Sequence, residues 1–430
     1  MERTQYAFFN NFASFMSSEY DHLAGHKLCT IAQLLSGQLR NNTHMLACNE
    51  RLRVPQGEFE FVRYPTRANE TLRAWDAADE FLLRHLAGRS ESAVLKGEIL
   101  IVNDAAGALS TALANHRPTV LSDSYLAHAA IRKNLGRNGL DASAVRYLTS
   151  SDPLPASIEA VVMKIPKSSA LLEDQLHHIV PRIHSKTIFI AGAMTKHLHT
   201  STLKLLAKIV GTTRSSLAER KARLIFCDPS PALERPPNRW PRTYTAGNTV
   251  VTSHAGVFSA SRLDGGASFL LDHLPHSLGP SRVVDLGCGN GILGVRTALA
   301  NHEAEVTFID ESYRAVASAK ATFEVNLGPE RTARFLVGNG MFDLANDAPL
   351  SKGSIDRVLN NPPFHETHAI RDAVAWQMFA ESRDVLRPGG ELWVVGNHHL
   401  AYQAKLKRLF GNCDRVASNA RFVVLRAVRA

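Results

Sequence analysis

The chain has 430 residues, enough for two domains of ordinary size, and its 45% hydrophobic and 21% charged residues are typical of a globular protein. No apolar run is long enough to cross a membrane, and the segment Met1 to Tyr20 lacks the basic and apolar regions of a secretory signal. Five scattered cysteines without a Cys-x-x-Cys pair indicate neither a disulfide framework nor a zinc site. We therefore expect a protein of the reducing cytoplasm.

The first α/β domain is expected over residues 46–228. Residues 1–45 show polar and aromatic clusters without a consistent period, and we treat them as an N-terminal extension. Further along, apolar runs alternate with helix-like segments. The run Ile99–Ile101 precedes a turn at Gly107, and the run Ile158–Met163 precedes Lys164. These are the strand and helix signals of an α/β domain.

Basic residues gather in this first half of the chain. Residues 46–245 contain 27 Lys and Arg against 19 Asp and Glu, whereas residues 246–430 contain 19 against 18. The densest segment, 196–242, has ten basic residues and three acidic ones. A field of this sign attracts a polyanion, although a solvated helix face beside a charged linker would give the same run. The Pro-rich stretch 229–245 predicts a stiff linker to a second domain, 246–430.

The second domain contains a glycine-rich turn. It follows the apolar run Arg282–Val284 and precedes a helix-like run from Ile292 to Leu299. Its informative positions are Asp285, Gly287, Gly289 and Gly291. Glycines allow the backbone to turn tightly and approach a ligand, and ligands bind at such carboxyl edges of parallel sheets. A dinucleotide fingerprint would need glycine at Ile292, so the turn does not favour NAD or FAD. The next apolar run ends at Asp310, whose carboxylate could accept hydrogen bonds from both hydroxyls of a ribose.

The motif Asn361-Pro362-Pro363-Phe364 follows another strand pattern, Ile355–Leu359, and so lies at the same edge of the sheet. The prolines fix φ and push Asn361 into an extended conformation. The Asn361 amide oxygen and the Pro362 carbonyl then form two fixed acceptors for the hydrogens of an amine, and Phe364 offers a face for stacking. The alternative is a Pro-rich turn that merely ends a strand. Together with the glycine turn, the motif predicts S-adenosylmethionine-dependent methylation of a nitrogen on a planar base.

The two halves of the chain repeat each other. Ser124-Tyr125 followed by Asn138 has the spacing of Ser312-Tyr313 followed by Asn326. When Ile158–Lys167 is aligned with Ile355–Phe364, Lys164 stands at the position of Asn361. The first copy keeps the strand and helix pattern but lacks the groups that would hold a cofactor or an amine. The expected fold is α/β, with two tandem Rossmann-like methyltransferase domains of which the N-terminal one is degenerate.

These motifs resemble those of the class I methyltransferases that modify guanine N2 in ribosomal RNA, and most of all the large-subunit, RlmG-type branch. The resemblance runs from about Leu52 to the C-terminus. Further matching segments are 74–80, 308–312, 374–376 and 421–425. Two departures are Ala260, where the family usually has Arg, and the long segment that precedes the Trp75 region.

The resemblance implies roles for individual residues. The cofactor would be held by Asp285, Gly287, Gly289, Gly291 and Asp310, with Asn339 at its adenine. The amine would be held by Asn361 and Pro362, and the base would stack on Phe364. No metal is expected, because His365, His398 and His399 lack a third ligand at useful spacing.

The partner implied is 23S rRNA, bound by a monomer without membrane contact. Guanine N2 lies on the pairing edge, so free rRNA or an early assembly intermediate is the expected substrate. A chain beginning near Ala246 is expected to keep S-adenosylmethionine binding and to lose most affinity for rRNA.

Several alternatives share parts of this pattern. A small-subunit 16S rRNA guanine-N2 methyltransferase would carry the same motifs. A protein-glutamine methyltransferase or a DNA adenine methyltransferase would use the same Asn-Pro-Pro geometry on other nitrogens, although the basic first half favours RNA. A noncatalytic RNA-binding assembly factor would keep only the fold, and the intact motifs at 285–291 and 361–364 disfavour it.

Overall fold

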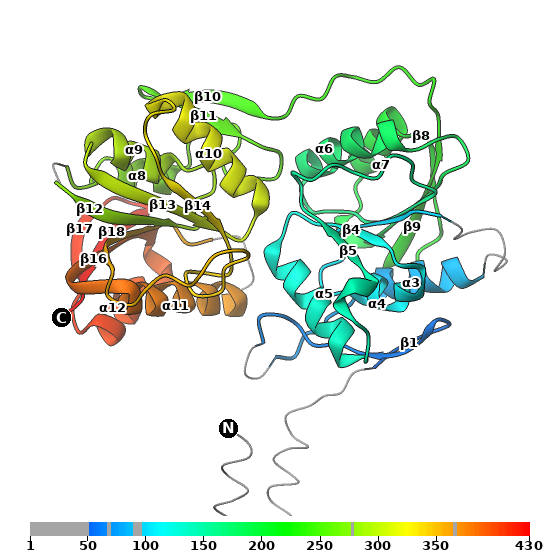
Figure 1. The fold of residues 1–430 in the computed structure, drawn as a ribbon, viewed down its shortest axis with the longest axis horizontal. Coiled ribbons are helices and arrows are strands. Elements are labelled where there is room, and N and C mark those ends of the chain that lie inside the picture. The colour runs from blue at the N-terminus through cyan, green and yellow to red at the C-terminus, as the bar shows by residue number, and fades with distance from the viewer. Residues whose placement is uncertain (1–50, 67–69, 89–96, 277–278, 364–367) are drawn as a thin grey trace, which may run out of the picture. The chain divides into compact units, whose positions relative to one another are not determined.

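The computed structural model describes residues 51–66, 70–88, 97–276, 279–363 and 368–430 (Figure 1). The expected extension, residues 1–45, lies outside this range, as do Phe364 and His365. Arg51–Ala430 form one compact unit that contains two large sheets. We call residues 51–229 the N-terminal half and residues 242–430 the C-terminal half.

The N-terminal half is built on a seven-stranded sheet with the order β5-β4-β3-β6-β7-β9-β8. Its strands are β3 (Ile99–Val102), β4 (Thr119–Leu121), β5 (Arg146–Leu148), β6 (Ala160–Lys164), β7 (Ile188–Met194), β8 (Gly211–Ser215) and β9 (Ala222–Pro229). The first five pair in parallel, while β9 runs antiparallel to β7 and β8. A hairpin of β1 (Arg51–Val54) and β2 (Gly57–Glu60) precedes the sheet.

Helices cover both faces of this sheet, as Figure 1 shows. One face packs against α3 (Ala77–Ala87), α4 (Ala108–Ala112) and α5 (Tyr125–Arg137), and the other against α6 (Ser169–Ile179) and α7 (Thr200–Ile209). The central strand β3, and β6 up to its last residue Lys164, are apolar and buried on both faces, as expected for parallel strands between helix layers.

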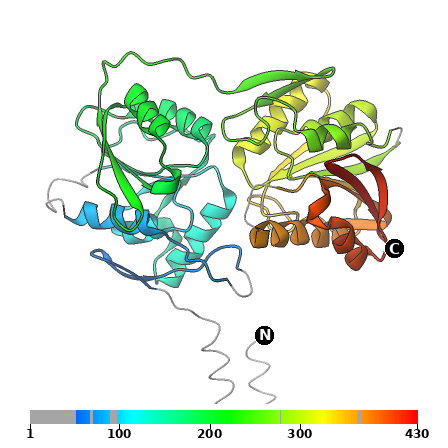
Figure 2. The same cartoon turned by 180° about the vertical axis from the view of Figure 1, so that it is seen from behind.

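The connector between the halves is shorter than the Pro-rich stretch in the sequence. Strand β9 continues through Pro229, and β10 (Arg242–Ala246) begins before the predicted end of the linker. Residues 230–241, visible from behind in Figure 2, have no regular secondary structure beyond turns. Strand β10 pairs with β11 (Thr249–Ser253), and Val250 N donates to Asn326 Oδ1 at 2.9 Å, which fixes this hairpin on a helix of the C-terminal half.

The C-terminal half repeats the same sheet, with the order β14-β13-β12-β15-β16-β18-β17. Its strands are β12 (Ser281–Leu286), β13 (Ala304–Asp310), β14 (Arg334–Val337), β15 (Ile355–Asn360), β16 (Leu386–Asn397), β17 (Asp414–Ser418) and β18 (Phe422–Val428). Again the first five pair in parallel, while β18 runs antiparallel to β16 and β17. The glycine turn and Asn361 both leave strands at the carboxyl edge, as predicted.

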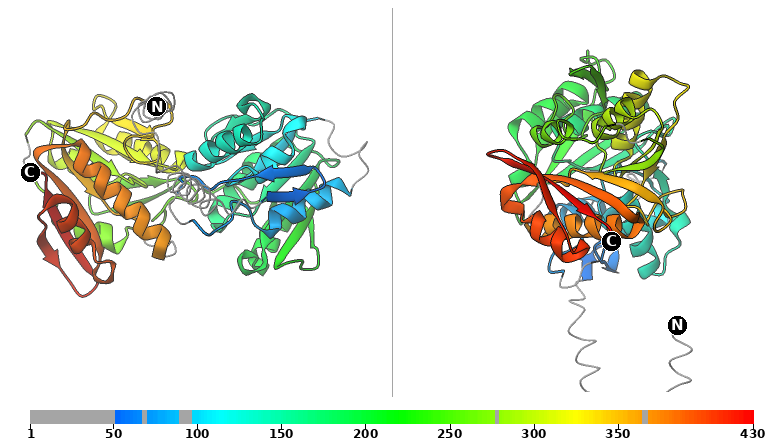
Figure 3. Two further views of the ribbon diagram at one scale, coloured as in Figure 1. Left: turned by 90° about the horizontal axis from the view of Figure 1, so that it is seen from below. Right: turned by 90° about the vertical axis from the view of Figure 1, so that its left-hand side faces the viewer.

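Helices flank both faces of the second sheet, which Figure 3 shows from two further directions. One face carries α8 (Gly265–Leu271), α9 (Ile292–Ala300) and α10 (Tyr313–Leu327), and the other α11 (His368–Val385) and α12 (Tyr402–Phe410). Helix α9 begins at Ile292, where the sequence predicted it, and α10 is capped by the Ser312 side chain.

The predicted fold class is confirmed: two α/β sheets of identical strand order lie in one chain. Among the helices that the structure describes, none is long and apolar enough to cross a bilayer.

Candidate active site

A cavity of about 450 Å³ lies at the carboxyl edge of β12, β13, β14 and β15. Six of the residues predicted for the site line it: Gly287, Gly289, Asp310, Asn339, Asn361 and Pro362. The topology explains this gathering, because parallel strands end at one edge of the sheet and β12, where the strand order reverses, lies between β13 and β15.

The glycine turn adopts a left-handed backbone at each of its three glycines, with φ of 71°, 54° and 79° at Gly287, Gly289 and Gly291. Apart from its two chain neighbours, no atom of the described residues would lie within 4 Å of a Cβ built on Gly289, so this position faces open space. A Cβ on Gly291 would lie 2.8 Å from the Ala319 Cα atom. Gly289 therefore allows close approach of a ligand, whereas Gly291 allows close packing of α9 against α10.

Asp310 braces the glycine turn. Its two carboxylate oxygens accept hydrogen bonds from the main-chain N–H groups of Gly289 and Ser312, both at 3.0 Å. Burial raises the pKa of this carboxyl. The carboxylate thus fixes the turn and also lines the cavity beside it.

Asp285 lies behind the wall of the cavity and is not among its lining residues. Its side chain is buried, Oδ2 accepts from Gly294 N at 2.8 Å, and Oδ1 has no partner among the described residues. Burial raises the pKa of Asp285 to about 7, and the Asp310 charge adds to the effect. Gly291 is likewise absent from the lining, for the packing reason given above.

The Asn361 side chain is oriented by Asp264, which lies 97 positions earlier in the chain. Asn361 Nδ2 donates to Asp264 Oδ2 at 3.4 Å, while Asn361 Oδ1 is buried without a partner among the described residues. Asp264 is itself fixed as the N-cap of α8, where it accepts from Ala267 N. The amide nitrogen is thereby held on one side, and the amide oxygen is left as an acceptor. Pro362 beside it is buried.

Asn339 is held in a tight loop after β14. Its N–H donates to the main-chain oxygen of Asp343 at 2.8 Å, and Gln377 Nε2 donates to its side-chain oxygen at 3.4 Å. Gln377 and Met378 of α11 also line the cavity. No motif in the sequence points to these two residues, since only the packing of α11 brings them to the site.

The N-terminal half has lost the equivalent site. Leu286 pairs with Asn360 in one sheet and Val102 with Met163 in the other, so Lys164 occupies the position of Asn361, as the repeat predicted. Lys164 Nζ lies 2.6 Å from Asp76 and 2.8 Å from Asp79. Asp76 caps α3 as Asp264 caps α8. An ion pair therefore fills the place of the amine site.

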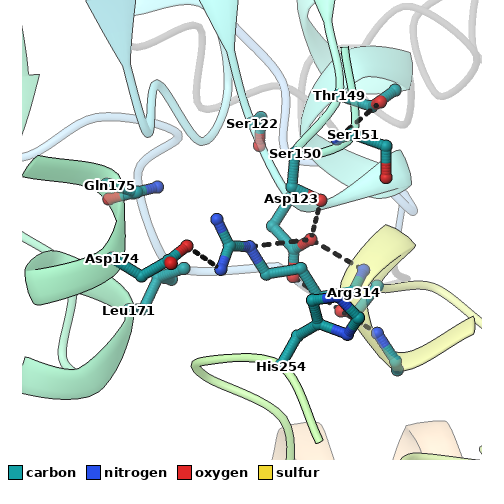
Figure 4. A network of polar contacts seen from close by, with 12 residues as sticks. Ser122, Asp123, Thr149, Ser150, Ser151, Leu171, Asp174, Gln175, His254 and Arg314 are labelled. Atoms are coloured by element: carbon teal, nitrogen blue, oxygen red, sulfur yellow. Dashed lines mark hydrogen bonds and ion pairs between the residues drawn. The ribbon is translucent and has the colours of Figure 1, made fainter. Parts of the chain in front are cut away.

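The two halves are joined by a buried polar network around Arg314 of α10 (Figure 4). The Arg314 guanidinium is paired with the Asp174 carboxylate of α6, and its main-chain N–H donates to Asp123 Oδ1 at 2.9 Å. Both side chains of the pair are less than a tenth exposed. Burial opposes ionisation of Asp174, but hydrogen bonding to His178 and the Arg314 charge hold its pKa below its usual range.

Basic side chains of the 196–242 segment are exposed on the N-terminal half. Lys204, Lys208 and Lys221 are exposed, and Arg223 is half-buried. Across the described residues, no group of three or more His, Cys, Asp or Glu could hold a metal ion.

This strand order, with a glycine turn and an Asn-Pro-Pro motif around one cavity, defines a Rossmann-like S-adenosylmethionine-dependent methyltransferase. Residues 49–231 match the RLMG N-terminal domain and residues 248–426 the Methyltransferase small domain. The ribosomal RNA large subunit methyltransferase G of Streptomyces avermitilis is 53% identical over 388 residues, covering 89% of this chain and 100% of the relative. The chain belongs to the ribosomal RNA large subunit methyltransferase G family.

A second relative of the same name, from Aeromonas salmonicida, is 47% identical over 374 residues, covering 85% of this chain and 96% of the relative. Among solved structures, a T. thermophilus 16S rRNA N2 methyltransferase (RsmC) in complex with AdoMet and guanosine superimposes with a TM-score of 0.67. It is 21% identical and covers 89% of this chain and 98% of its own, so the likeness concerns the fold. The relatives' names favour the large subunit over the small-subunit alternative.

Proposed function

We propose that this protein transfers a methyl group from S-adenosylmethionine to the exocyclic N2 of a guanine in 23S rRNA. The observation that carries the proposal is the state of Asn361: its amide nitrogen is engaged by Asp264, and its buried oxygen has no partner among the described residues. A buried acceptor of this kind needs a donor, and an amine hydrogen of the substrate supplies one.

The chemistry requires two such acceptors. The nitrogen of an exocyclic amine is a poor nucleophile, because its lone pair is delocalised into the ring. Acceptors on its two hydrogens, the Asn361 amide oxygen and the Pro362 carbonyl, localise the lone pair and stabilise the positive charge that develops on nitrogen. Phe364, outside the described residues, is proposed to stack on the base. Bound S-adenosylmethionine supplies the electrophilic methyl group.

The cavity fits this cofactor. Gly289 faces open space, Gly287 lines the cavity where a Cβ would lie 3.0 Å from the Met378 Cε atom, and Asp310 lines the wall beside them. We assign cofactor binding to Gly287, Gly289, Asp310 and Asn339. Asp285, which accepts from Gly294 N, and Gly291 act from behind the cavity wall by fixing the start of α9.

The substrate must present an unpaired guanine, because N2 lies on the base-pairing edge. Free 23S rRNA or an early assembly intermediate meets this requirement. We assign residues 46–228 as a degenerate, RNA-holding domain and 246–430 as the catalytic domain of a monomeric, cytoplasmic enzyme. The stretch 229–245, whose irregular part is 230–241, is assigned as the linker. Residues 1–45 are assigned as an extension of this core.

Asn361→Ala tests the proposal. Turnover on rRNA is expected to fall on the order of 10²-fold or more, while affinity for S-adenosylmethionine changes little, because the lost acceptor acts mainly as charge develops on the attacking nitrogen. Single-turnover methyl transfer and calorimetric titration measure the two quantities. Asn248→Ala, at an exposed asparagine in the β10–β11 turn, is the matched control and should change neither. Equal losses of cofactor affinity and turnover at Asn361 would show that the residue is structural.

A further inference from the structure

The cavity wall is completed from the N-terminal half. Pro65, just after the β1–β2 hairpin, and Leu126, in the first turn of α5, line it together with the glycine turn and the Asn339 loop. The cavity that we assign to the cofactor is therefore shared by both copies of the repeat.

Two tyrosines of the N-terminal half hold the loop that contains Asn339. Tyr125 Oη donates to Asp343 Oδ1 at 2.6 Å, and Tyr64 Oη donates to Asp343 Oδ2. Both carboxylate oxygens of Asp343 are thus engaged by the other half of the chain. Burial, together with the neighbouring carboxylate, raises the pKa of Tyr64 to about 12, so its hydroxyl remains a donor at neutral pH.

The main chain of Asp343 is in turn hydrogen-bonded to Asn339. Asn339 N donates to the Asp343 main-chain oxygen, and Gly338 forms a bridge with Leu344. The turn is tight: a Cβ on Gly338 would lie 2.4 Å from the Asp343 main-chain oxygen. Fixing the Asp343 side chain therefore fixes the position of Asn339 in the cavity wall.

A second set of contacts keeps Leu126 in place. Ser124 Oγ donates to Glu311 Oε2 at 2.6 Å, and Ser312 Oγ donates to Asp123 Oδ2 at 2.6 Å. Main-chain hydrogen bonds also link the two halves here: Tyr125 N donates to Glu311 O and Tyr313 N donates to Asp123 O, both at 3.0 Å. Each copy thus binds the first turn of the other copy's helix, α5 or α10, and Leu126 is held against the cavity.

We propose that Tyr64 and Tyr125 are positioning residues for cofactor binding, and that the degenerate copy forms an obligatory part of the S-adenosylmethionine pocket. The inference rests on the proposed function, in which Asn339 contacts the adenine. It replaces the expectation that a chain beginning near Ala246 keeps S-adenosylmethionine binding, because such a chain lacks Tyr64, Pro65, Tyr125 and Leu126.

The test uses the full chain and calorimetric titration with S-adenosylmethionine. Tyr125→Phe and Asp343→Asn should each weaken binding on the order of 10-fold, because the first removes a hydrogen bond to a charged group and the second removes the charge. The double variant should be weakened by clearly less than the product of the two single effects, since both changes act on one interaction. The Michaelis constant for rRNA should stay within about twofold, a separation that general loss of structure would not produce.

Tyr147→Phe is the matched control. It removes a tyrosine hydroxyl from the same half, and that hydroxyl is buried without a partner among the described residues. Wild-type affinity is expected for this variant. Wild-type affinity in the Tyr125 and Asp343 variants, or independent effects in the double variant, would overturn the inference.

If the Tyr125 and Asp343 variants fail to fold, Leu126→Trp tests whether the N-terminal half forms part of the pocket. A larger side chain at this half-buried position narrows the cavity without removing a hydrogen bond, and should weaken S-adenosylmethionine binding at least 10-fold. Undiminished affinity would show that the N-terminal half does not wall the pocket. Failure of the wild-type chain itself to bind S-adenosylmethionine would instead contradict the proposed function.

Discussion

At the residue scale, the same residue type serves different purposes in one motif. Gly289 and Gly291 are two positions apart and both have positive φ, yet one faces the cavity and the other the Cα atom of Ala319. The glycine pattern in the sequence cannot separate these purposes, because both require a missing Cβ. Substitutions can separate them.

Gly289→Val is expected to abolish S-adenosylmethionine binding in a protein that still folds, since the new side chain occupies the cavity rather than the core. Gly291→Ala is expected to lower the melting temperature by several degrees, because its Cβ would lie 2.8 Å from Ala319 Cα. Calorimetric titration and thermal unfolding measure the two effects. Undiminished cofactor affinity in Gly289→Val would contradict the assignment of this turn to cofactor binding.

Asp285 predicts a pH dependence of stability. Its pKa is raised from 3.8 to about 7 in the folded protein, chiefly by burial. Between those pH values the folded state holds a proton that the unfolded chain has lost, so this group's contribution to stability falls as pH rises from about 4 to about 7. Asn at this position carries no titrating proton and keeps an acceptor for Gly294 N–H.

The melting temperature of cofactor-free Asp285→Asn, minus that of the wild type, should therefore increase as pH rises from about 4 to about 7. Asp141→Asn, at an exposed carboxylate whose pKa is lowered by hydrogen bonding to Ser143, should show no such increase. A pH-independent difference for Asp285→Asn would mean that Asp285 is already ionised in the folded state.

At the scale of elements, the helices α5 and α10 do more than cover their own sheets. Their first turns exchange hydrogen bonds across the two halves, and Arg314 on α10 reaches the Asp174 carboxylate on α6. A buried ion pair adds little net stability over an apolar pair, but loss of one partner leaves an uncompensated buried charge.

Arg314→Ala is therefore expected to lower the free energy of unfolding by about 3 kcal/mol, because Asp174 remains buried. Urea unfolding followed by tryptophan fluorescence measures the change. Arg282→Ala removes an exposed ion pair with Glu305 and should cost less than about 1 kcal/mol. Similar small losses in both variants would show that the Arg314 network does not join the halves.

At the scale of the whole molecule, charge and chemistry lie in different halves. The N-terminal half carries most of the net charge of +9, whereas the glycine turn and Asn361 belong to the nearly neutral C-terminal half. Yet the cavity that we assign to the cofactor is lined by residues of both halves. The degenerate copy thus combines a basic surface with a structural part in the active site.

Replacing four basic residues of the N-terminal half with neutral ones should weaken rRNA binding. It should also flatten the salt dependence by roughly one unit of slope for each of the four that binds a phosphate in the parent protein. The four are Lys204, Lys208, Lys221 and Arg223. The control set consists of exposed basic residues of the C-terminal half: Lys320, Lys352, Lys407 and Arg415. Filter binding across a range of salt concentrations measures both sets. Parental binding by the first set at every salt concentration would mean that this surface is not the RNA platform.

The strands that lead into the site, the two turns that follow them and the repeat could be predicted from the amino acids alone, whereas the ends of β9 and β10 could not. Glycine and proline act on their own backbone, and apolar runs mark buried strands whatever surrounds them, so the turn at 285–291 and the edge position of Asn361 were predictable. What holds these groups in place became visible only in the folded chain. The Asp264–Asn361 and Tyr125–Asp343 contacts join residues that are 97 and 218 positions apart in the sequence. Gly291 is needed because its α-carbon packs closely against Ala319 of α10. Such contacts depend on how the helices pack on the two sheets. The sequence around one residue does not indicate which distant residue will contact it.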